Sequence, residues 1–173
     1  MSNKRNMEVN ISSETLKQAA QEGVDEFVLA VKDAIVDAAG GELNAAALGN
    51  LNAEQVTLWG YFILREEVMD GGFIQLIYNG YGSFFFRNPF ARAVEGWGMD
   101  ELASIIRKAH RVYDKNRAEL EKERSDEDFM ALFEQFPQFD EFDDSFVENE
   151  EEWTAMIAHY VDEHLDNFVH VVE

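Results

Sequence analysis

Acidic side chains in the last third of this 173-residue chain form its densest group of chemically active residues. Eight of the thirteen residues from 140 to 152 are acids: Asp140, Glu141, Asp143, Asp144, Glu148, Glu150, Glu151 and Glu152. If the segment is helical, with about 1.5 Å of rise per residue, it carries about one charge per 2.4 Å. Duplex DNA carries about one charge per 1.7 Å, or about one per 3.4 Å along a single strand. The spacing therefore predicts a surface that can occupy the lysines and arginines of a phosphate-binding protein.

Phenylalanines recur among these acids at steps of three or four, and they predict one face held in the core with the carboxylates turned outward; they are Phe133, Phe136, Phe139, Phe142 and Phe146. The same helix places like charges three and four residues apart, at a total cost of about 1–3 kcal/mol at low salt. So consistent a departure from the local rule favours a functional role. A solvated face that serves solubility is the alternative that composition leaves open.

A second acidic run, Asp126, Glu127 and Asp128, completes the predicted set of phosphate-mimicking, partner-binding residues. The acids are unevenly distributed, because residues 1–118 hold 12 Lys/Arg and 16 Asp/Glu whereas residues 119–173 hold 2 and 19. The net charge of −21 opposes direct contact with nucleic acid or an anionic membrane and favours a basic partner. Bases gather between residues 105 and 124, where we expect them to pair with nearby acids or to face solvent.

Motifs for catalysis, metals and cofactors are missing from the sequence. There is no cysteine, Walker loop, His-Glu-x-x-His or Gly-x-Ser-x-Gly. The segment 140–151 has the length of a calcium loop, but Phe142 and Ser145 stand where a ligand and a glycine are needed. Three late histidines, spaced by five and six residues, do not share a helix face; they are His159, His164 and His170. We therefore predict no enzyme, no metal and no cofactor.

The apolar pattern that must position the acids is helical almost throughout. It predicts an all-α fold with about seven to nine helices in a single compact domain, residues 1–173, whose C-terminal third, 125–173, is acidic. The expected helix starts are Ser12 or Ser13, Ala45, Asn52, Asn88-Pro89, Asp100 and Ser125. The first helix is expected to be one long helix that lasts until Gly40-Gly41, and Asn52 with Gln55 three residues on resembles a capping box. Gly40-Gly41 and Gly71-Gly72 are expected to end helices, and the last helix to run from about Glu150 to His170. A strand competes at Phe84–Phe86 alone.

No apolar run reaches the roughly 18 residues that a membrane span requires. The beginning of the chain is polar and lacks an apolar signal core. We therefore expect a cytoplasmic protein.

Two sequence blocks carry a resemblance to a known family. They are the stretch from Trp59 and Tyr61 through Gly71-Gly72-Phe73-Ile74-Gln75 to Tyr78-Asn79-Gly80, and the stretch from Phe139 to Phe146. From about Gln55 onward the chain resembles bacterial DNA-mimic proteins of about nineteen kilodaltons and a wider family of helical bacterial proteins. The resemblance implies an all-α, non-catalytic homodimer that displaces DNA from a helix-turn-helix transcription factor. It implies a histone-like nucleoid protein as a second candidate partner.

Two other functions remain open from the residues. The first is an acidic interaction module, immunity or chaperone-like, that binds a basic partner unrelated to DNA. The second is an enzyme or cation-binding protein without a recognisable motif. We predict that the protein is a DNA mimic. It is expected to block a DNA-binding protein and so to act in transcription regulation.

Overall fold

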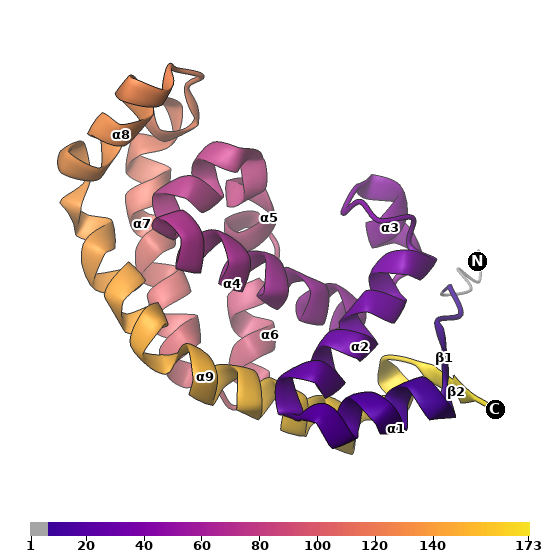
Figure 1. Cartoon of the computed structure of the whole chain (residues 1–173). Coiled ribbons are helices and arrows are strands. Elements are labelled where there is room, and N and C mark those ends of the chain that lie inside the picture. The colour runs from indigo at the N-terminus through magenta and orange to yellow at the C-terminus, as the bar shows by residue number, and fades with distance from the viewer. Residues whose placement is uncertain (1–6) are drawn as a thin grey trace. The chain divides into compact units, whose positions relative to one another are not determined.

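The structure is a computed structural model that describes residues 7–173, and Figure 1 traces the order of its elements. The α-helices of this part of the chain are α1 (Ser13–Glu22), α2 (Val24–Ala38), α3 (Ala45–Asn50), α4 (Ala53–Leu76), α5 (Gly82–Arg87), α6 (Phe90–Gly96), α7 (Asp100–Glu121), α8 (Asp126–Gln135) and α9 (Asp140–Glu163). The short elements are β1 (Asn10–Ser12), the π-helical turn η1 (Ile77–Tyr81), the 3-10 turns η2 (Pro137–Phe139) and η3 (Leu165–Asn167), and β2 (His170–Val172). The predicted all-α class is confirmed. The polar start of the chain, residues 1–6, lies outside the described residues.

The chain divides into two compact units. One unit comprises the described residues 7–59 together with 152–173, and the other comprises Gly60–Glu151. The boundaries fall inside α4 and α9, so each of these helices contributes to both units. The single domain expected from the sequence stays a prediction, and the two units are described separately below.

In the first unit, α1 and α2 replace the single long helix that the apolar pattern predicted. The prediction was wrong at Gly23, whose φ of 152° and ψ of 178° interrupt the helix. The positive φ disfavours any residue with a side chain at this position, and a Cβ there would also displace the Glu26 carboxylate, whose Oε2 lies 2.6 Å away. The break lets α1 fold back onto α2, whose Val28, Val31 and Ile35 are fully buried.

The start of α4 is fixed by the capping box that the sequence predicted. The Gln55 backbone N–H donates to Asn52 Oδ1 at 2.8 Å, and the Asn52 N–H donates to Gln55 Oε1 at 3.0 Å. The Gln55 amide also donates to the carbonyl of Phe168 at 2.8 Å. This contact ties the start of α4 to the end of the chain.

The C-terminal segment corrects a second prediction, because α9 ends at Glu163 and does not reach His170. The residues from 170 to 172 form β2, which pairs in parallel with β1 in the register Asn10 with His170. Local periodicity gave no sign of this strand, because a strand of three residues exists only through its partner.

The second unit packs a core of aromatic side chains between α4, α5, α7 and α9. Phe73, Phe85, Phe139, Phe146 and Tyr113 are each 0–2% exposed. The candidate strand at Phe84–Phe86 was wrong, because these residues lie in α5, where Phe85 meets the ring of Phe90 edge-on. Residues Gly71 and Gly72 interrupt the helical backbone of α4, as the sequence predicted, with Gly72 at φ 74° and ψ −176°, and the helix resumes after this kink.

Candidate functional site: an acidic surface of the second unit

The acidic run 126–128 forms the first turn of α8. The side chain of Ser125 accepts a hydrogen bond from the Asp128 N–H at 3.2 Å, as the sequence predicted for a helix cap. Asp126, Glu127 and Asp128 are all exposed. Three carboxylates here are stabilised by the positive end of the helix dipole, so this cluster has a structural reason as well as a potential for binding.

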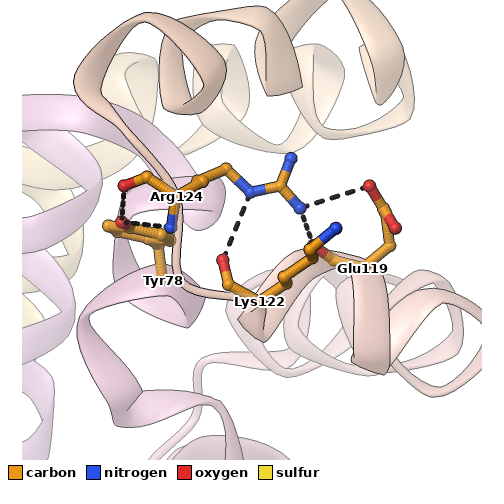
Figure 2. Close-up of polar contacts among 4 residues, drawn as sticks. All are labelled: Tyr78, Glu119, Lys122 and Arg124. Atoms are coloured by element: carbon orange, nitrogen blue, oxygen red, sulfur yellow. Dashed lines mark hydrogen bonds and ion pairs between the residues drawn. The ribbon is translucent and has the colours of Figure 1, made fainter.

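A tyrosine and an arginine fix the chain immediately before this turn (Figure 2). The Tyr78 hydroxyl donates to the Arg124 carbonyl at 2.9 Å and accepts from the Arg124 N–H at 3.4 Å. The Arg124 guanidinium is directed at the end of α7, where it donates to the Lys122 carbonyl at 3.2 Å and pairs with Glu119 at 3.2 Å. The last base of the sequence is therefore bound to α7 and leaves the acids of α8 unneutralised.

Along the part of α9 that lies in the second unit, residues 140–151, the acids separate into an outward set and an inward set. The outward set consists of Asp140, Glu141, Asp144, Glu148 and Glu151, all exposed and without an ion pair to any residue of the described chain. At about 100° per residue, these five positions span about 100° of the helix circumference. They form one stripe, which we call the α9 acidic stripe.

The opposite face of α9 is held by the phenylalanines that the sequence singled out. Phe139 and Phe146 are fully buried, and Phe142 is half-buried. The ring of Phe142 meets Phe73 of α4 edge-on, with 6.4 Å between centroids, and Phe146 lies 6.5 Å from the ring of Tyr61. This anchoring orients the helix, so the outward carboxylates have a fixed backbone beneath them.

Asp143 belongs to the inward set, and its carboxylate caps the second part of α4, which begins after the kink at Gly71-Gly72. Its Oδ1 accepts a hydrogen bond from the Phe73 N–H at 2.8 Å, where α4 resumes after its kink. A Cβ added to Gly72 would lie 2.3 Å from Asp143 Oδ2, so only glycine allows this approach. Burial, together with the charges of Asp140 and Asp144, raises the pKa of Asp143 to about 6, although the bond from Phe73 opposes the shift.

Glu150 is the second inward acid. It is 8% exposed and pairs with Arg65 of α4 at 2.8 Å. The Arg65 guanidinium also lies 5.6 Å from the centre of the Phe62 ring. This ion pair fastens α9 to α4 and removes Glu150 from the surface.

The two sequence blocks that carried the resemblance therefore meet in space. The Gly-Gly-Phe block supplies the kink and the N–H group, and the Phe139–Phe146 block supplies the carboxylate and the rings that pack there. Beyond the kink, the Gln75 amide donates to Glu67 and Asp70 at 3.0 Å each, and the Asn79 amide donates to Glu67 at 2.8 Å. Much of the shared pattern thus builds the scaffold that presents the acids.

These contacts reduce the surface predicted from sequence. Asp143 and Glu150 serve the fold, and the exposed Glu152 belongs to the other unit. Helical spacing could have revealed the inward pair, because Asp143 lies four residues after Phe139 and Glu150 lies four after Phe146. The five acids of the stripe lie within about 18 Å of helix, or about one per 3.6 Å. This density is close to the value of about one per 3.4 Å for a single DNA strand.

The bases of α7 are partly paired, as expected. Arg117 pairs with Glu121 at 3.0 Å. Arg107 pairs with Glu95, and its hydrogen bond and charge hold the pKa of Glu95 below the ordinary value. Other bases of this region face solvent, namely Lys108, Arg111, Lys115 and Lys122.

The late histidines make local contacts in the first unit. His159 lies 3.1 Å from Glu163, and His164 Nδ1 lies 2.8 Å from the Tyr160 carbonyl. Within residues 7–173, no three His, Asp or Glu side chains are arranged to hold a metal ion. The helices described here include none with the length and apolar character needed to cross a membrane.

Comparison of the sequence with known proteins assigns the chain to a family. The sequence model of the DMP19-like protein family matches residues 49–164, which include α4 to α9 and the whole acidic surface. The chain is 31% identical over 126 residues to a protein of Neisseria meningitidis serogroup B (strain ATCC BAA-335 / MC58) named DNA mimic protein DMP19. The matched region covers 72% of this chain and 76% of that protein. The chain therefore belongs to the DMP19-like protein family.

Proposed function

We propose that this protein is a DNA mimic that binds a DNA-binding protein of helix-turn-helix type and blocks its access to DNA. The observation that carries the proposal is the α9 acidic stripe, whose five carboxylates are exposed on one face of an anchored helix. The family relation supports the same reading, because the relative from Neisseria meningitidis is named a DNA mimic.

The mechanism is competition for phosphate-binding side chains. A DNA-binding protein presents lysines and arginines to phosphate oxygens, and carboxylates accept the same charge-assisted hydrogen bonds. The first turn of α8 adds three exposed acids to the five of the stripe within the same unit. Because opposite charges attract over a distance, association is fast and weakens steeply as salt is added.

The mechanism requires no bond to be made or broken, so we propose a non-catalytic inhibitor that acts where transcription factors act, in the cytoplasm. A histone-like nucleoid protein, which also binds the DNA backbone, is a second partner of the same chemistry. A homodimer would bring two acidic surfaces together and lengthen the array.

A mobility-shift competition assay tests the proposal. The test variant combines Asp144→Asn, Glu148→Gln and Glu151→Gln, which removes three charges from the stripe. Asp143 and Glu150 are left intact, because their substitution would disturb the contacts with Phe73 and Arg65. We expect the parent chain to release DNA from a helix-turn-helix protein, and the triple variant to lose that ability.

A matched control removes three exposed charges from the first unit, with Glu22→Gln, Asp37→Asn and Glu42→Gln. This control has the same net charge as the test variant, and we expect it to compete like the parent chain. Equal loss in both variants would mean that net charge alone acts. Full activity of the stripe variant would refute the proposed site.

A further inference from the structure

The carboxylates of the α9 acidic stripe account for affinity toward phosphate-binding proteins in general. They do not by themselves account for selectivity for one such protein over another. In protein–DNA complexes, phosphate contacts position the protein, whereas contacts to base edges specify the sequence. By analogy, non-ionic groups on the acidic surface of a mimic can add selectivity to that of the charge pattern. This inference rests on the proposed function and asks which groups those are.

Val147 is the first such group. Between residues 140 and 152, every exposed side chain is an acid except Val147, which is 54% exposed. It lies three residues after Asp144 and four before Glu151, so its methyl groups adjoin the α9 acidic stripe. A single exposed valine is ordinary in proteins, but this valine is the one exposed apolar residue among the exposed acids of residues 140–152.

Met130 on α8 is the second group, and like Val147 it is an exposed apolar side chain with acids three and four residues away on the same helix. It is 63% exposed, the highest value among the large apolar side chains exposed in the described chain. Asp126 and Glu127 precede it by four and three residues, and Glu134 follows by four, so all three acids share its helix face. Methionine is flexible and polarizable, which suits contact with apolar surfaces of varied shape.

We propose that Val147 and Met130 are the partner-selecting contacts of the acidic surface. They fit a DNA-binding face on which apolar side chains stand among the phosphate-binding bases. Readers of the major groove have such a face, because they contact the thymine methyl group with apolar side chains. The methyl groups of Val147 then stand for thymine methyls, beside carboxylates that stand for phosphates.

The experiment measures binding to a panel of purified helix-turn-helix DNA-binding domains, with poly-L-lysine as a probe that reads charge alone. The test variants are Val147→Thr and Met130→Gln. Matched controls are Val24→Thr, at a valine that is 55% exposed in the first unit, and Met69→Gln, at a methionine that is 45% exposed on α4. Affinity is followed over a series of salt concentrations, and thermal unfolding shows that each variant is folded.

We expect each test variant to lose affinity about fivefold for the domains that the parent chain binds best, because an apolar contact is replaced by a polar one. The loss is the same at every salt concentration, and the slope of affinity against salt is unchanged. Binding to poly-L-lysine, and all binding by the control variants, equals that of the parent chain.

Two failures are distinguishable. If Val147→Thr and Met130→Gln bind every domain like the parent chain, while the stripe variant Asp144→Asn, Glu148→Gln, Glu151→Gln loses affinity and salt dependence, this inference is wrong and the proposed function stands. If the stripe variant also binds like the parent chain, or if the parent chain binds no domain in the panel, the proposed function fails and the inference fails with it.

Discussion

Helix α7 and the first half of α9 are both rich in charged residues but use them differently. On α7, bases and acids are interspersed and some of them pair, as in Arg117 with Glu121 and His110 with Asp114. In the first half of α9, residues 140–151, every exposed residue except Val147 is an acid, and these acids form no ion pair within the described chain. The charges of α7 therefore support the fold, whereas those of the α9 acidic stripe oppose it through mutual repulsion.

The contrast also runs through α9 itself, where neighbouring acids have opposite roles. Glu150 is buried against Arg65, and Glu151 faces solvent. Asp143 caps the kinked helix at Phe73, and Asp144 faces solvent. Adjacent residues of α9 thus differ in role, one stabilising the fold and the next facing solvent. Single substitutions can therefore test the two roles independently.

The largest effect is expected for Glu150→Ala. Its removal breaks the ion pair with Arg65 and empties a buried position on α9, so the free energy of unfolding falls by about 2–4 kcal/mol. Urea denaturation measures the change. The neighbouring Glu151→Ala serves as control, with an expected change within about 0.5 kcal/mol. Equal destabilisation by the two variants would contradict the assignment of Glu150 to the fold.

A smaller effect is expected for Asp143→Ala, which removes the acceptor of the Phe73 N–H and lowers the free energy of unfolding by about 1 kcal/mol. Asp143→Asn keeps an acceptor oxygen and removes the buried charge, so it is expected to be neutral or stabilising at pH 7. Asp144→Ala is the matched surface control. If Asp143→Asn destabilises as much as Asp143→Ala, the charge itself holds the cap, and our account of this contact is wrong.

Asp143 also predicts a pH dependence of stability. Its pKa is about 6 in the folded protein, against an ordinary value of 3.8, so the folded state holds this proton more tightly. The pH-dependent part of the stability that Asp143 contributes is therefore complete below about pH 4 and is lost as the pH rises through about 6, whereas the hydrogen bond from Phe73 is a separate contribution. The measurement is the difference in unfolding free energy between the parent chain and Asp143→Asn, which should change across this range. A difference independent of pH would exclude the raised pKa.

The smallest effect, with the opposite sign, is expected for Glu148→Lys. The new base lies four residues from both Asp144 and Glu152 and relieves repulsion, which stabilises the protein by about 0.5 kcal/mol at low salt. The gain should vanish at high salt, because exposed charges are screened. The same variant is expected to compete less well for a DNA-binding protein. Loss of stability at low salt would show that the acids of α9 do not repel one another.

Local signals predicted much of the fold. The capping box of Asn52 and Gln55 and the cap at Ser125 act over three residues, so the sequence contains all that they require. The spacing of the phenylalanines was enough to predict the buried face of α9. The break at Gly71-Gly72 was predicted, whereas the break at Gly23 was not, because a glycine permits several backbone paths and packing selects one.

By itself, the sequence determined the sign, amount and uneven distribution of charge, the helical class and the face of α9 that is buried, since these follow from composition and a period of 3.6 residues. Helical spacing also places Asp143 and Glu150 toward the buried face, but only the tertiary structure decided which groups they bind there. The bond from Phe73 to Asp143 spans 70 positions of the chain, and that from Arg65 to Glu150 joins the same two helices. Such partners depend on how α4 packs against α9, and no local pattern encodes a contact between residues so distant in sequence.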